Sequence, residues 1–160
     1  MLERLKQGMS NPHVGILVLR VIIFGTLFMK HGTPKLFDFH GELIGDGGYP
    51  NVFHLGQVGT LLIATFADGI CSMLVVLGFA TRWAVLYSFC NFTVGWGVVH
   101  GFAFTGTEGR IAEQITLYLV ACVAVFCLGP GKYSIDGLIE ASADKKRMAG
   151  QYVGQVRARA

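Results

Sequence analysis

Hydrophobic positions along the chain gather into four long runs, which short polar stretches separate. The runs cover residues 14–32, 57–79, 83–100 and 111–129. Each run approaches or exceeds the roughly 20 apolar residues that a helix needs to cross the hydrocarbon core of a bilayer. The pattern predicts an all-α protein, with an integral membrane four-helix bundle over residues 1–139 and a basic cytoplasmic tail over residues 140–160.

Residues that start and stop helices support these boundaries. Asn11-Pro12 offers an N-cap and a first-turn proline for the first run, and Gly129-Pro130-Gly131 follows the last run. A cleavable signal peptide is an alternative interpretation of the first run, since Arg4 and Lys6 precede it. Arg20 interrupts its apolar core and no small-x-small cleavage site follows, so we expect the first helix to be retained.

The composition excludes an ordinary soluble domain. Of 160 residues, 52% are hydrophobic and 14% are charged, and the mean hydropathy is +0.53. All four cysteines lie inside the apolar runs, so no disulfide framework is expected. The chain holds no phosphate-binding loop, dinucleotide fingerprint or hydrolase nucleophile motif. We therefore expect no nucleotide cofactor, and membrane lipids rather than nucleic acid as partners.

The distribution of Lys and Arg predicts the orientation of the chain in the membrane. With four crossings both termini share one side, which carries nine of these residues, while the opposite side carries three. Cytoplasmic loops are enriched in Lys and Arg. Both termini are therefore predicted to be cytoplasmic, and the loop of residues 38–56 to be extracytoplasmic.

Basic residues form one predicted stripe on the first helix. At 100° per residue, Arg20 and His31 lie about 20° apart, and Lys35 follows His31 by four residues. Phe24 and Phe28 fall between them. Ionisable groups within a span usually face a bundle interior and mark a functional site. A basic anchor at the membrane interface is the alternative interpretation.

Further ionisable residues lie on the other three runs. Asp68 stands near the middle of the second run, where a charge costs about 2.5–3.5 kcal/mol on insertion scales. Its alternative role is a structural polar contact with a neighbouring helix. Trp96 and His100 share a face of the third run, and Glu113 opens the fourth. Because helical side chains lean toward their own N-terminus, five titratable groups are expected to converge near the outer half: His31, Lys35, Asp68, His100 and Glu113.

This set of residues predicts a pocket for a quinone or a related phenolic ring. Carboxylates and imidazoles exchange protons, ammonium groups donate hydrogen bonds to ring oxygens, and aromatic side chains enclose the ring. The expected proton-exchanging residues are Asp68, Glu113 and His31. The expected quinone-binding residues are Lys35, His100, Arg20, Trp96 and Phe28. A metal or haem held by His31 and His100 competes with this hypothesis, but no paired ligand spacing occurs, so we predict no metal site.

Four short patterns follow one another along the chain. They are Leu19-Arg20, His31-Gly32-Thr33-Pro34-Lys35-Leu36, Leu77-Gly78-Phe79-Ala80-Thr81-Arg82 and Gly129-Pro130-Gly131-Lys132-Tyr133-Ser134-Ile135-Asp136. Together they resemble the patterns of the DoxX family of small four-helix membrane proteins. The positions that match the family's motifs are Arg20, His31, Lys35, Arg82 and Glu113. The second helix departs from the family, since Asp68-Gly69 stands where a glutamate is usual.

The resemblance implies a multi-pass protein of the bacterial inner membrane. The family takes its name from the membrane subunit of thiosulfate:quinone oxidoreductase, and relatives are associated with quinone stress or with membrane oxidoreductase complexes. We therefore expect a quinone-interacting subunit that receives electrons from a redox partner protein. A non-enzymatic membrane anchor or assembly factor is the alternative, and a transporter is a weaker one. Whether the chain catalyses a reaction itself stays open, and a homo-oligomer is compatible with the sequence.

Overall fold

The computed structural model describes residues 11–102 and 107–159, and all regular structure within them is helical. Among these residues, three helices are long and apolar enough to cross a membrane: Pro12–Phe37, Gly56–Leu77 and Ile111–Leu128. The helix over the predicted run 83–100 is not among them, because polar residues such as Ser88, Asn91 and Thr93 interrupt its apolar sequence. Arg4 and Lys6 lie outside the described residues.

The first long helix alternates between α-helical and π-helical turns. Its segments are α2 (Pro12–Leu19), η1 (Arg20–Phe24), α3 (Gly25–Leu27), η2 (Phe28–Gly32) and α4 (Thr33–Phe37). The Asn11 side chain accepts a hydrogen bond from the His13 N–H at 3.1 Å, which confirms the predicted N-cap. The helix continues past the predicted end at residue 32, because Pro34 falls in the first turn of α4, where a missing N–H is tolerated.

Two π-helical segments lie within the predicted stripe of the first helix. In a π-helix the hydrogen bonds run from residue i to i+5, so each turn takes more residues than an α-helical turn. Both η1 and η2 lie on the path from Arg20 to His31. The buried side chains Arg20, Phe24 and Leu27 nevertheless keep spacings of four and three residues, so this side of the helix faces inward, as predicted.

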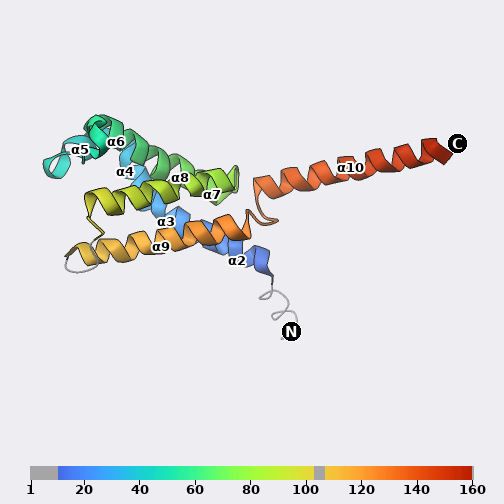
Figure 1. The fold of residues 1–160 in the computed structure, drawn as a ribbon, viewed down its shortest axis with the longest axis horizontal. Coiled ribbons are helices and arrows are strands. Elements are labelled where there is room, and N and C mark those ends of the chain that lie inside the picture. Colours follow the sequence, from blue (N-terminus) through green and yellow to red (C-terminus); the bar gives the residue numbers. More distant parts are fainter. Residues whose placement is uncertain (1–10, 103–106, 160) are drawn as a thin grey trace.

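The remaining long helices run back and forth beside the first. The second consists of α6 (Gly56–Thr65), η5 (Phe66–Cys71) and α7 (Ser72–Leu77); the third of α8 (Thr81–Val94) and η6 (Gly95–Val99); the fourth is α9 (Thr107–Leu128). α9 ends directly before Gly129-Pro130-Gly131, as predicted. α8 packs along α9, and η5 packs against both η2 and α8 (Figure 1). We call the end near Pro12 and Leu128 the terminal end, and the opposite end the loop end.

Short helices and a long one complete the chain. At the loop end, residues 38–55 form α5 (Phe39–Ile44) and the 3-10 turns η3 (Gly45–Gly47) and η4 (Val52–His54). At the terminal end, α10 (Ile135–Arg159) leaves the other helices and extends away from them (Figure 1). The core between the long helices is apolar and includes Phe24, Leu27, Val75, Val85 and Val125, all at most 1% exposed.

A carboxylate fastens the start of α10 to the turn between α7 and α8. Asp136 accepts hydrogen bonds from the Ala80 and Thr81 N–H groups and from the Thr81 hydroxyl, each at 2.9 Å. Burial alone would raise the pKa of Asp136, but these hydrogen bonds and the charge of Arg20 outweigh it, so the pKa lies below its ordinary value. The Asp136 N–H in turn donates to the Gly78 carbonyl at 2.9 Å.

Arg20 belongs to the same terminal-end cluster. Its side chain is fully buried and donates a hydrogen bond to the Tyr133 carbonyl at 2.8 Å. Gly78, which has φ +73°, ends α7 beside the guanidinium, and a Cβ at this position would collide with Arg20. Three of the four patterns that resemble the DoxX family therefore meet in one cluster that joins the first, second and last parts of the bundle.

Candidate functional site

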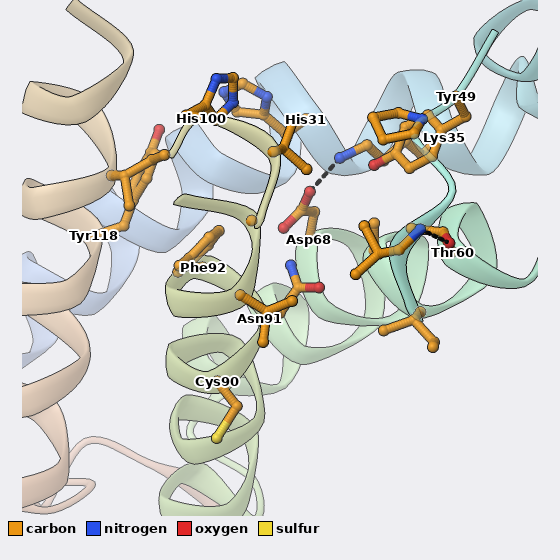
Figure 2. A pocket seen from close by; sticks show the side chains of 18 of the residues that line it. His31, Lys35, Tyr49, Thr60, Asp68, Cys90, Asn91, Phe92, His100 and Tyr118 are labelled. Atoms are coloured by element: carbon orange, nitrogen blue, oxygen red, sulfur yellow. Dashed lines mark hydrogen bonds and ion pairs between the residues drawn. The ribbon is translucent and has the colours of Figure 1, made fainter. Parts of the chain in front are cut away.

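The described residues enclose a cavity of about 640 Å³ toward the loop end (Figure 2). Small-molecule pockets have volumes of roughly 300–1,000 Å³. Most of the lining is aliphatic or aromatic. The polar side chains labelled in the figure are His31, Lys35, Tyr49, Thr60, Asp68, Asn91, His100 and Tyr118. The cavity therefore combines an apolar wall with a few polar groups, as ligand sites usually do.

An ion pair between Lys35 and Asp68 forms the charged part of the wall. The Lys35 ammonium contacts Oδ2 of Asp68, and the two side chains are only 12% and 6% exposed. Lys35 comes from α4 and Asp68 from η5, so the pair joins the first and second long helices. Charged groups this buried are rarely found without a partner, since desolvation is compensated only by close pairing.

Two glycines allow the backbones of η2 and η5 to approach closely. A Cβ at Gly32 would overlap the Asp68 carbonyl, and a Cβ at Gly69 would overlap the Leu36 side chain. Small residues at such crossings are the usual means of close helix packing in membranes. The short backbone distance brings the Lys35 ammonium within reach of the carboxylate.

The second carboxylate oxygen of Asp68 has no protein donor among the described residues. Oδ1 is buried and accepts no hydrogen bond from the protein. Asn91 projects from α8 into the cavity toward Asp68 (Figure 2). A buried acceptor without a donor is unfavourable by about 1–3 kcal/mol. Asp68 is thus an incompletely satisfied acceptor in the cavity wall.

Tyr49 covers the ion pair from the loop side. Its ring centroid lies 5.9 Å from the Lys35 ammonium, a distance typical of a cation–π contact. Burial raises the pKa of Tyr49 above its ordinary value, and Lys35 only partly opposes this. Tyr49 therefore stays a neutral phenol near pH 7. The loop that carries Tyr49 is held in place by the Thr60 hydroxyl, which accepts a hydrogen bond from the Val52 N–H at 3.1 Å.

Aromatic rings line the side of the cavity nearest α9. The His31 ring meets Tyr118 edge to face, with centroids 6.3 Å apart. Tyr118 in turn stacks on Phe92, with centroids 5.4 Å apart and ring planes 23° apart. Such pairs stabilise one another beyond simple burial. They form a flat, weakly polar wall opposite the second helix.

The structure brings together four of the five titratable residues that were expected to converge. His31, Lys35, Asp68 and His100 line the cavity. Glu113 does not line it, and its side chain is exposed. The reason is helical geometry, since the α9 residues that line the cavity include Gln114 and Tyr118, and Glu113 points roughly 100° away from Gln114.

Three of the residues expected to bind a quinone lie outside the cavity wall. Arg20 is in the terminal-end cluster. Trp96 packs edge to face against Phe102, with centroids 5.3 Å apart. Phe28 is not among the lining residues, and Leu27 lines the cavity instead. Arg20 is buried on the same inward side as Leu27, but it lies eleven residues from His31, about 16 Å along the helix, and this depth places it outside the cavity.

Several residues that line the cavity were not predicted from the sequence. Asn91 is a polar side chain within an apolar run, and this property alone could have indicated it. Tyr118 stands on the correct face of the fourth run, but a tyrosine there is no strong signal. Tyr49 lies in a loop, where no periodicity predicts direction. Among the residues that the structure describes, no group of three His, Cys, Asp or Glu side chains could hold a metal ion.

The family model described as DoxX matches residues 15–101, more than half of the 160 residues. The chain belongs to the DoxX family. The matched segment contains His31, Lys35 and Asp68, together with the glycines that bring the ion pair together. No curated protein and no solved structure matches the chain. Family membership and the three apolar helices together identify this DoxX protein as a membrane protein.

Proposed function

We propose that this DoxX protein is a four-helix protein of the bacterial inner membrane with both termini in the cytoplasm. α8 packs along α9 and continues into η6, which supports a fourth crossing although this helix is less apolar than the others (Figure 1). The terminal end then faces the cytoplasm, in keeping with its excess of Lys and Arg. The cavity lies in the extracytoplasmic half of the bundle.

Within the membrane, we propose that the protein is a quinone-interacting subunit of an oxidoreductase system. The observation that carries this proposal is the Lys35–Asp68 ion pair in the wall of a largely apolar cavity. A quinone ring needs donors for its oxygens and flat apolar walls. Lys35 and His31 can donate, and Tyr118 and Phe92 provide a flat wall. The residues present therefore fit this group.

Each residue of the site has a defined task in this proposal. When bound, a quinone supplies two-electron, two-proton redox chemistry. Lys35 would donate a hydrogen bond to a ring oxygen and hold the ring in place, while Asp68 would keep the ammonium in position and pass a proton to the reduced ring. His31 would carry protons from the loop end to the site. Tyr49 covers the pair and excludes water. The electrons come from a separate redox partner protein.

The test is to purify the protein mildly from its native membrane and to identify bound quinones and partner proteins by mass spectrometry and visible spectra. We expect a stoichiometric quinone in the wild-type protein and its loss in the Asp68→Asn variant. Glu113→Gln is the matched control, because it removes a carboxylate that lies outside the cavity. A wild-type protein that folds, keeps native lipids and carries no quinone would contradict the proposal.

A membrane anchor or assembly factor is the second candidate function. The observation that favours it is α10, a 25-residue helix that extends away from the bundle and is fastened to it at Asp136. A partner recovered equally well with wild-type protein and with the Asp68→Asn variant would support this role. A partner lost only on removal of residues 140–160 would assign the contact to α10.

A further inference from the structure

The cavity is bounded by facing sides of α6 and α8. On α6, Thr60, Ile63 and Ala64 line it, and at 100° per residue they share one face. On α8, Cys90 and Asn91 line it in the same way. The two helices therefore form opposite walls of a cleft that continues into the space around the ion pair.

One edge of this cleft is open to the outside of the protein. Within each wall the inner residue is covered and its neighbour is not. Ala64 is 7% exposed whereas Ile63 is 41% exposed, and Asn91 is half-buried whereas Cys90 is exposed. Ile63 and Cys90 therefore form the rim of the cleft. Both are apolar or weakly polar, which suits contact with hydrocarbon rather than with water.

Tyr87 closes the cleft toward the terminal end. Its hydroxyl donates to the Ile63 carbonyl at 3.5 Å, and its ring meets Phe66 edge to face with centroids 5.0 Å apart. The opening of the cleft therefore begins on the loop-end side of the Tyr87 contact and extends toward the loop end. Cys90 lies at the end of the cavity away from His31 and His100 in Figure 2.

The rim lies at a depth where the surroundings are lipid. Ile63 stands seven residues into the apolar helix Gly56–Leu77, about 10 Å from its start at 1.5 Å per residue. A hydrocarbon core is about 30 Å thick, so this position faces acyl chains when the helix spans the membrane.

We infer that the quinone reaches the site sideways from the bilayer through the cleft between α6 and α8, and that its apolar tail stays at Ile63 and Cys90 while its ring contacts Lys35. This inference rests on the proposed function and specifies its ligand as a lipid-soluble quinone with a tail. The cavity continues from the charged pair to the exposed apolar rim, which matches the polarity of such a molecule from ring to tail.

Two exposed cysteines of the chain provide a reporter and its control. Cys90 lies at the rim, whereas Cys127 is exposed on α9 and does not line the cavity. Wild-type protein in lipid vesicles is labelled with a lipid-soluble maleimide, and the label on each cysteine is followed by peptide mass spectrometry. The probes are decylubiquinone and the same ring with a methyl group in place of the tail.

We expect decylubiquinone, at about ten times its Kd, to slow labelling of Cys90 about tenfold, as occupancy of one site predicts. Cys127 keeps its rate, and the tail-less ring protects Cys90 less. Ile63→Trp, which fills the rim, lowers the association rate of decylubiquinone about tenfold, the effect of about 1.4 kcal/mol added to the barrier. Leu62→Trp, at the same depth and 56% exposed outside the cavity, leaves that rate unchanged.

The two proposals fail in different ways. Decylubiquinone that binds, while Cys90 is labelled at its original rate and Ile63→Trp behaves like Leu62→Trp, would overturn the lateral route and leave the quinone site standing. Protein that folds and binds no decylubiquinone at all would overturn both. Binding is measured independently, as the decylubiquinone that vesicles with protein retain in excess of protein-free vesicles of the same lipid.

Discussion

The Lys35 ammonium and the Asp68 carboxylate meet across two helices although 33 residues separate them in the chain. Their contact depends on the backbone crossing at Gly32, where the carbonyl of Asp68 occupies the space of a side chain. The ion pair thus links the packing of the first two long helices to the chemistry of the cavity. Variants of the charged pair and of the glycine crossing separate these two contributions.

Removal of either charge is expected to destabilise the protein, and removal of both is expected to restore much of the loss. Asp68→Asn or Lys35→Met leaves a buried charge without its partner, which costs about 3 kcal/mol. The double variant holds no unpaired charge, so its free energy of unfolding should lie closer to that of the wild type. Thermal unfolding of the purified protein in detergent measures the stabilities.

The amount of quinone that the same three variants retain separates the role of the ion pair in binding from its role in stability. We expect it to be lost in all of them, including the double variant whose fold is restored. A double variant as unstable as the single ones would show that the pair is not an isolated ionic contact. A double variant that keeps the quinone would exclude the charged pair from the binding site.

Gly32→Ala is expected to separate the first and second long helices. The new Cβ would overlap the Asp68 carbonyl, and such overpacking costs about 1–3 kcal/mol. Gly25→Ala is the matched control on the same helix, because a Cβ there meets no atom within 4 Å. That variant should be unchanged or more stable by about 0.5–1 kcal/mol, since glycine weakens a helix. Equal unfolding temperatures of the two variants would contradict the close crossing.

Asp136 is expected to make the terminal-end cluster sensitive to acid. Its pKa in the folded protein lies below the ordinary value, so its stabilising effect is fully present above the unfolded pKa of about 3.9. The effect is lost as the pH falls through the depressed folded-state pKa. Hydrogen bonds to a charged group contribute about 1.5–3 kcal/mol. Denaturation followed between about pH 7 and pH 2 measures this loss.

The Asp136→Asn variant should be less stable than the wild type at neutral pH and should lose less stability on acidification. Asp144→Asn is the control, because Asp144 is exposed on α10 and accepts no hydrogen bond from the α7–α8 turn. A variant at residue 136 with the full acid response of the wild type would assign that response to other carboxylates.

Glu113→Gln and His31→Gln are expected to differ in quinone affinity. His31 lines the cavity, and loss of one hydrogen bond of about 1.4 kcal/mol weakens binding about tenfold. Glu113 is exposed on the other side of α9, so its variant should bind as the wild type does. Equilibrium binding of decylubiquinone in vesicles measures both. A loss of affinity in the Glu113 variant alone would restore the role expected from the sequence.

Local features of the chain were readily predicted. The apolar runs place the long helices, Asn11 caps the first, and Gly129-Pro130-Gly131 ends the fourth. These features depend on residues that are neighbours in the chain. The patterns around Arg20, His31 and Gly78 also indicated the DoxX family correctly. Why those patterns exist was not visible until Arg20, Gly78 and Asp136 were seen in one cluster.

The cavity was predicted only in part. His31, Lys35 and Asp68 were expected to converge because ionisable groups in a membrane avoid lipid. Glu113 was expected to join them but does not line the cavity, whereas Asn91, which was not expected, does, because each position depends on how a helix is rotated about its axis. Hydropathy sets this rotation poorly when one face meets lipid and the other meets an apolar core.

By itself the sequence therefore determined an all-helical DoxX membrane protein, since the length of each apolar run and its capping residues are local properties. The tertiary structure alone decided which polar side chains share the cavity and which ones fasten the terminal end. The contact at Gly32 fixes the separation of the first two long helices, and the rotation of α9 turns Gln114 and Tyr118, but not Glu113, toward the cavity. Neither effect follows from the residue spacing within one helix, because both depend on packing between segments distant in the chain.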